Sequence, residues 1–106
     1  MNWKLNQEDG DGETGVILKK KVKRPPKYKV LLHNDDYTTM EFVVYILKTV
    51  FAKTTEEATG IMLKVHHDGH GVCGIYSHEV AETKMKKVST EAKKNGHPLL
   101  CTIEPE

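Results

Sequence analysis

The first regular pattern in the chain is an alternation of apolar and polar residues over 28–33. In "YKVLLH", every second residue is large and apolar, namely Tyr28, Val30 and Leu32. This period of two is typical of a half-buried strand. The polar sequence "NDD" at 34–36 interrupts the pattern, so we predict that the strand ends there.

Apolar residues then recur at three- and four-residue spacing, which indicates a helix. Thr38 and Glu41 have the spacing of a capping box, in which a hydroxyl and a carboxylate satisfy the first free amides. We therefore predict a helix over 39–52. Its apolar residues spread beyond one face, so this helix should be buried on more than one side.

A second capping-box spacing, Thr54 and Glu57, predicts another helix over 55–68. Gly69 follows at the position where a left-handed residue commonly ends a helix. The residues expected to face inward from this helix are Ala58, Ile61, Met62 and Val65.

Three more elements complete the pattern. "GVCGIYS" has the composition of a strand, on which Cys73 and Ile75 should share the inward face. Ser77 can cap a third helix over 78–95, and "PLLCTIE" predicts a closing strand. The order β-α-α-β-α-β predicts an α+β fold: a three-stranded, mostly antiparallel sheet with three helices on one face. The polar residues Lys29, His33 and Thr102 suit the other, solvated face.

The segment before the first strand has a different composition. Residues 1–26 contain an acidic stretch, "EDGDGE", a basic stretch, "KKKVKR", and a final pair of prolines, but only "GVIL" to bury. Tandem proline removes two backbone donors and marks a boundary. We therefore predict a flexible N-terminal arm over 1–26 and one folded domain over 27–106.

Overall composition narrows the class of protein. A chain of 106 residues has the size of a single domain, and 38% hydrophobic with 29% charged residues is ordinary for a globular protein. No apolar run approaches the roughly 18 residues of a membrane span, and "MNWKLNQEDGDG" lacks the apolar core of a signal peptide. We expect a cytoplasmic protein that acts neither in a membrane nor, at a net charge of +1, on nucleic acid.

The stretch "KVHHDGHGVC" raises a metal hypothesis. His66, His67, His70 and Cys73 are residue types that bind zinc, and His66 and His70 have the i, i+4 spacing of two ligands on one helix. However, Gly69 should end the helix between them. A small zinc-binding or metalloenzyme domain is therefore kept as the alternative to a protein without cofactor, with both cysteines as buried thiols.

A second candidate site lies in "HNDDYTTMEFV", residues 33–43. Asparagine and two aspartates crowd a strand-to-helix turn, where such residues commonly bond local amides. If the first two helices pack together, the apolar residues behind this turn form a cup with Asn, Asp and His at its mouth; these residues are Met40, Val43, Met62 and Val65. The alternative is that these four residues are simply core.

Three long segments resemble the ClpS family of adaptors: "YKVLLHNDDYTTMEFV", "IMLKVHHDGHGVCGIYSHEVAETK" and "HPLLCTIE". The resemblance implies a monomeric, non-enzymatic protein that binds N-degron substrates, whose first residue is Leu, Phe, Tyr or Trp. It would deliver them to the AAA+ unfoldase ClpA for degradation by the ClpAP protease. Thr39 stands where the family commonly has proline, at the first turn of a helix, which tolerates proline without requiring it.

The resemblance also implies roles for individual residues. Asn34 and His66 would bond the α-amino group of the substrate, with Asp36 assisting and Asp35 near the start of the ligand backbone. The side-chain pocket would be lined by Thr38, Met40, Val43, Met62, Val65 and Leu99, with Met40 as a gate against β-branched first residues. Glu79 and Lys84 match positions that dock on the N-terminal domain of ClpA. A third hypothesis, nucleic-acid binding through the basic arm and the lysines of the third helix, predicts steeply salt-dependent binding.

Overall fold

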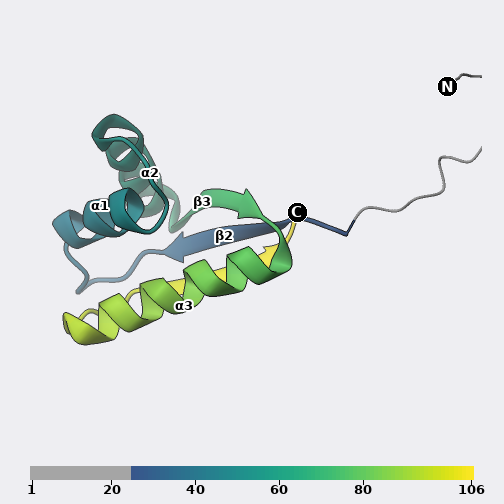
Figure 1. The fold of residues 1–106 in the computed structure, drawn as a ribbon. Coiled ribbons are helices and arrows are strands. Elements are labelled where there is room, and N and C mark those ends of the chain that lie inside the picture. The colour runs from purple at the N-terminus through teal and green to yellow at the C-terminus, as the bar shows by residue number, and fades with distance from the viewer. Residues whose placement is uncertain (1–24) are drawn as a thin grey trace, which may run out of the picture.

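The computed structural model describes residues 25–106, which form one sheet and three helices (Figure 1). In chain order the elements are β2 (Tyr28–His33), α1 (Met40–Thr49), α2 (Thr55–Asp68), β3 (His70–Tyr76), α3 (His78–Lys94) and β4 (Leu100–Pro105). The predicted order is confirmed. The arm predicted over 1–26 lies outside the described residues, except for its last two prolines.

Strand β2 occupies the centre of the sheet and pairs with β3 on one side and with β4 on the other. Both pairings are antiparallel, so the predicted sheet is confirmed. On one face, Lys29 Nζ lies 3.5 Å from a Glu104 carboxylate oxygen, and His33 Nε2 lies 2.7 Å from Thr102 Oγ1. These cross-strand pairs belong to the face that was expected to be solvated.

The pairing of β3 with β2 contains a bulge. Val30 pairs with Gly74 while the next residue of β2 pairs with Val72, so Cys73 is an extra residue without a partner. A bulge inverts the alternation of side chains beyond it. Cys73 is therefore 1% exposed, as predicted, whereas Ile75 is 46% exposed, and its predicted inward position is wrong.

Helix α1 begins one residue later than the sequence predicts. Thr39 is its N-cap, and the Thr39 hydroxyl oxygen accepts from the Phe42 amide at 3.1 Å. The predicted capping box of Thr38 and Glu41 is wrong, because the Thr38 hydroxyl donates to Asp35 instead, at 2.8 Å. The helix also ends at residue 49 rather than 52.

The signals that define α2 and α3 are confirmed. Thr54 and Glu57 form the predicted capping box, and Gly69 ends α2 with a φ of 92°. Ser77 caps α3, which ends one residue earlier than predicted and is followed by Gly96 at a φ of 73°. Within residues 25–106, no helix combines the length and hydropathy needed to cross a membrane.

A single core lies between the sheet and the helices. Val30 and Leu32 of the central strand are fully buried against residues from all three helices. The largest of the helical contributions are Phe42, Ile46, Leu47, Val65 and Val88. Because the alternate residues of β2 face away from this cluster, the helices share one face of the sheet.

Candidate functional site

The polar turn after β2 is organised by one carboxylate. Asp35 Oδ1 accepts from the Tyr37 amide at 2.8 Å and from the Thr38 amide at 2.7 Å, while Asp35 Oδ2 accepts from the Thr38 hydroxyl at 2.8 Å. Partial burial raises the pKa of Asp35, but these hydrogen bonds outweigh it and leave the pKa below its ordinary value. Both carboxylate oxygens of Asp35 are therefore committed to the turn.

Beside this turn lies a cavity of about 250 Å³ between α1 and the end of α2. Nine of the ten residues predicted for the pocket line it: Asn34, Asp35, Asp36, Thr38, Met40, Val43, Met62, Val65 and His66. The tenth, Leu99, is 7% exposed and is not among the residues that line this cavity. It packs in the same core cluster as the lining residues Val43 and Val65, and its role in the pocket stays a prediction.

Two contacts bring the turn after β2, the end of α2 and the start of β3 together. The Asn34 amide donates to the carbonyl of Gly69 at 2.8 Å, which joins the turn after β2 to the end of α2. Gly71 lies so close to α2 that a Cβ added there would be 2.9 Å from Val65 Cγ2. Only a residue without a side chain allows this approach, so Gly71 positions the pocket wall without lining it.

The cavity has an apolar floor and a polar mouth. Val43 and Val65 are 7% and 3% exposed, and Met62 is half-buried. At the mouth, Asn34, Asp36 and His66 are exposed. Their side chains make no hydrogen bond to any other residue of 25–106. The site therefore combines unused acceptors with a hydrophobic recess.

The side chains of the zinc hypothesis do not converge. The His67 side chain is 89% exposed and its Nδ1 lies 3.0 Å from an Asp68 oxygen, whereas the side chain of Cys73, on β3, is buried in the core. Burial raises the pKa of the Cys73 thiol to about 12, which opposes the thiolate form that binds metal. Among residues 25–106, no group of three or more candidate ligands lies close enough to hold an ion.

The two residues predicted to dock on an unfoldase differ in their surroundings. Glu79 is exposed in the first turn of α3. The Lys84 ammonium, by contrast, donates to the carbonyl of Val50 at 2.8 Å and lies 5.9 Å and 5.2 Å from the ring centroids of Phe51 and Tyr76. Lys84 thus ties α3 to the end of α1, a role that sequence reasoning missed because its partner is 34 positions away.

Comparison with known proteins matches the sequence of this chain to a family. A family model described as "ATP-dependent Clp protease adaptor protein ClpS" matches residues 23–102. The chain belongs to the ClpS family. Its members are described as adaptor proteins of the ATP-dependent Clp protease.

Individual ClpS proteins match over nearly the whole chain. The ClpS adapter of Parvibaculum lavamentivorans is 56% identical over 93% of this chain and 92% of its own length. The Methylococcus capsulatus adapter is 51% identical over 98% of both chains. A solved structure of Agrobacterium tumefaciens ClpS2 bound to L-phenylalaninamide is 42% identical, with a TM-score of 0.76, and covers 78% of this chain and 100% of its own.

Proposed function

We propose that this ClpS protein recognises N-degrons in the cytoplasm as a monomer. Its pocket binds the free amine and the large apolar first side chain of a substrate that begins with Leu, Phe, Tyr or Trp. The protein then delivers this substrate to ClpA for degradation by ClpAP. The observation that carries the proposal is the cavity itself, in which unused acceptors surround the entrance to a recess of buried valines.

The mouth of the cavity suits an N-terminal ammonium group. A free α-amino group has a pKa of about 7.7 to 8.0, so at neutral pH it is mostly a cation with three donors. Asn34 offers a carbonyl oxygen, Asp36 a carboxylate, and a neutral His66 one ring nitrogen, and all three line the cavity. Three donors thus meet three acceptors. Asp35 contributes by holding the turn that carries two of them.

The recess suits one side chain and not a larger ligand. Its volume of about 250 Å³ is below the roughly 300 to 1,000 Å³ of pockets that enclose drug-sized molecules. Met40 and Met62 line it together with the two valines, and methionine adapts its shape to different apolar groups. We expect Met40, 46% exposed at the rim, to hinder first residues that branch at Cβ.

Neither part of the pocket suffices alone. Burying a Leu or Phe side chain contributes about 1.5 to 3 kcal/mol, and each hydrogen bond to a charged group contributes about as much. Association costs about 4 to 15 kcal/mol in lost freedom, so the apolar side chain alone gives no net affinity, and three bonds to the amine, about 4.5 to 9 kcal/mol together, leave little. The protein should therefore reject both an acetylated N-terminus and an internal leucine, since each supplies only one of the two groups.

Delivery requires a second surface, which we place on α3 around Glu79 and Lys84. Glu79 is exposed and available for a partner. Docking through the Lys84 ammonium would require its bond to Val50 to break. The exposed carboxylate is accordingly the stronger candidate for direct contact with the N-terminal domain of ClpA.

Peptide binding tests the recognition step directly. Fluorescence anisotropy would compare one labelled peptide that begins with Phe, its N-acetylated copy and a copy that begins with Val. We expect the acetylated copy to bind on the order of 100-fold more weakly, which corresponds to a loss of about 3 kcal/mol of amine contacts. Equal affinity for the free and acetylated peptides would overturn the proposal.

A further inference from the structure

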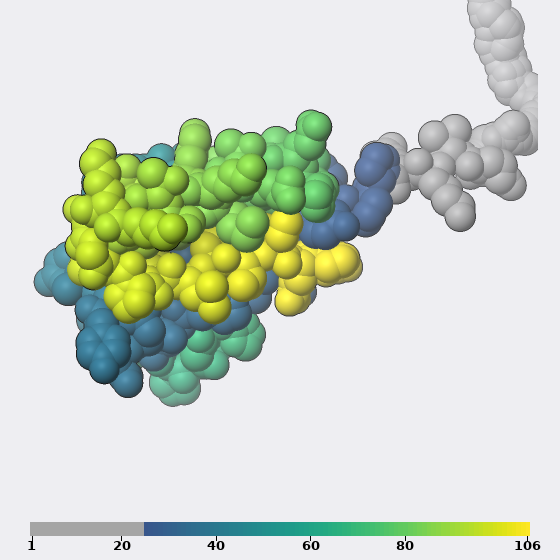
Figure 2. Space-filling view, turned by 90° about the horizontal axis from the view of Figure 1, so that it is seen from below, coloured from purple at the N-terminus to yellow at the C-terminus, as the bar shows by residue number. Residues whose placement is uncertain are grey.

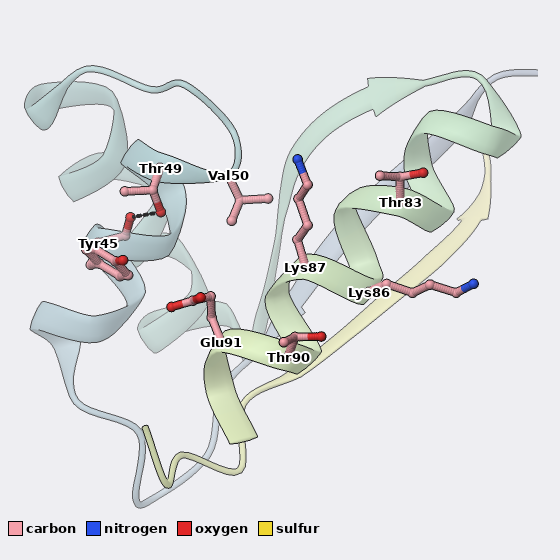
Figure 3. A pocket seen from close by; sticks show the side chains of 8 residues that line it. All are labelled: Tyr45, Thr49, Val50, Thr83, Lys86, Lys87, Thr90 and Glu91. Carbon is pink, nitrogen blue, oxygen red and sulfur yellow. Dashed lines mark hydrogen bonds between the residues drawn. The ribbon is translucent and has the colours of Figure 1, made fainter. Parts of the chain in front are cut away.

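A larger hollow lies between α1 and α3, and shares no lining residue with the cavity that Met40 and Val43 line. Figure 3 shows it between α1 and α3, with Tyr45 and Val50 on one wall and Lys86 and Lys87 extending from the other helix. Its volume is about 510 Å³. A neighbouring cavity of about 480 Å³ shares Tyr45 and Glu91 with it and continues toward the end of α3. Together they form one groove, the α1/α3 groove.

Charge is unevenly distributed along α3. Its first turns carry Glu79 and Glu82, whereas lysines predominate beyond the middle of the helix, where Glu91 is the only acid. Lys86 and Lys87 are exposed, and neither forms an ion pair within residues 25–106. The groove therefore offers the Lys87 ammonium beside the wall formed by Tyr45 and Val50, while Lys86 points outward from the outer edge of the groove (Figure 3).

The sequence before the folded domain has the opposite order of charge. Counting back from Pro25, the basic run Lys19–Arg24 comes first, then the apolar Val16–Leu18, and then the acidic stretch Glu8–Glu13. Such a segment, running back from Pro25 with slack, would leave its lysines nearest Glu79 and Glu82 and would let its acids reach Lys86 and Lys87. Opposite charges would then meet at both places.

The point at which the chain enters the domain permits this alignment. The Tyr28 ring lies 4.7 Å from the ring of His78, the first residue of α3, and the Glu106 amide donates to Lys27 at 2.9 Å. Figure 2 shows the first described residues beside the start of α3. Glu13 lies twelve positions before Pro25, so up to about 40 Å of chain joins them, which is more than the length of α3, about 25 Å.

We propose that residues 8–18 of this chain bind in the α1/α3 groove, with Glu8–Glu13 against Lys86 and Lys87 and Val16–Leu18 against the wall formed by Tyr45 and Val50. A tethered segment acts at millimolar effective concentration, so weak contacts suffice to populate the bound form. The binding of residues 8–18 in the groove does not depend on the proposed recognition of a substrate amine. One consequence does rest on the proposed function: a segment bound along α3 competes with a partner that docks there.

Paramagnetic NMR on the full chain tests the contact. A nitroxide is attached to Gly10→Cys, while the native Cys73 and Cys101 are buried and have pKa values raised to about 12, so they stay unlabelled. We expect the amide signals of Lys86 and Lys87 to be lost and to return at high salt. Unchanged signals would overturn the proposal. It would also be overturned if the signals were lost only through a nitroxide on a second copy of the protein, because the contact would then be between two molecules.

Charge reversal tests the pairing. Lys86→Glu with Lys87→Glu should restore the signals around the groove, and reversing the acids of residues 8–13 to lysine in the same protein should remove them again. The matched control, Lys53→Glu with Lys64→Glu, makes the same change in charge beside a different cavity, lined by Lys53 just before α2 and by Lys64 on α2, and should leave the signals lost. Signals that stay lost after reversal at Lys86 and Lys87 would contradict the electrostatic pairing.

Discussion

Replacing Asp35 with alanine should separate the stability of the turn from the chemistry of the pocket. The substitution removes the acceptor of two backbone amides and of the Thr38 hydroxyl. Each hydrogen bond to a charged group contributes about 1.5 to 3 kcal/mol, and water can replace much of this at a turn that is only half-buried. We expect a loss of about 2 kcal/mol, similar to the loss of a strong helix cap.

For a domain of this size, such a loss lowers Tm by about 10 °C. The effect should also depend on pH. Because the pKa of Asp35 is lowered in the folded protein, its ionisation stabilises the fold above the ordinary value of 3.8, and this contribution is lost as pH falls through the folded pKa. Thermal unfolding followed by circular dichroism should therefore show a large gap between wild type and Asp35→Ala at pH 7 and a smaller gap at pH values well below 3.8.

The matched control is Asp36→Ala, which removes the same charge from the next residue. The Asp36 side chain accepts no hydrogen bond within residues 25–106, so Tm should stay within about 2 °C of wild type, as for most surface substitutions. Affinity for a Phe-starting peptide should nevertheless fall about tenfold, equivalent to about 1.4 kcal/mol. Equal Tm losses in the two variants, or none in Asp35→Ala, would refute the assignment of turn and ligand roles.

Three further predictions concern the surroundings of the site. Lys84→Met keeps the aliphatic stem but removes the donor to the end of α1, and should lower the free energy of unfolding by about 1.5 kcal/mol in urea titrations; Lys86→Met, which loses no such bond, should not. Gly71→Ala places a methyl group 2.9 Å from Val65 Cγ2, in the wall of the pocket. The free energy of unfolding should therefore fall by about 1 to 3 kcal/mol, and the affinity for a peptide should fall several-fold. Finally, burial raises the pKa of Cys73 and Cys101 to about 12, so a thiol reagent at pH 8 should react with the urea-unfolded chain but hardly with the folded one; rapid labelling of the native protein would contradict this.

Local signals were enough to predict most of the fold, because they act within a few residues. The capping box at Thr54 and Glu57 and the left-handed Gly69 define the ends of α2 almost to the residue. The start of α1 was harder to predict, since two adjacent threonines can each act as a cap. Thr39 takes this role because Asp35 engages Thr38.

Features that depend on distant partners could not be predicted. The bulge at Cys73 exists only relative to β2, and the bond from Lys84 to Val50 joins two helices. In the pocket, spacing alone left open whether the apolar residues were core, and resemblance to a family supplied the set of lining residues. Neither could show that Asp35 is committed to the turn while Asp36 is not, because that distinction depends on the local conformation of the backbone.

The bond between the Asn34 amide and the Gly69 carbonyl has a consequence for how the pocket opens. It joins the two walls of the cavity at the edge of the core, so this amide should exchange its hydrogen with solvent only when the walls separate. Exchange at this single position would therefore report the free energy of opening the pocket, independently of global unfolding. A ligand that spans both walls should slow it by the factor expected from its occupancy.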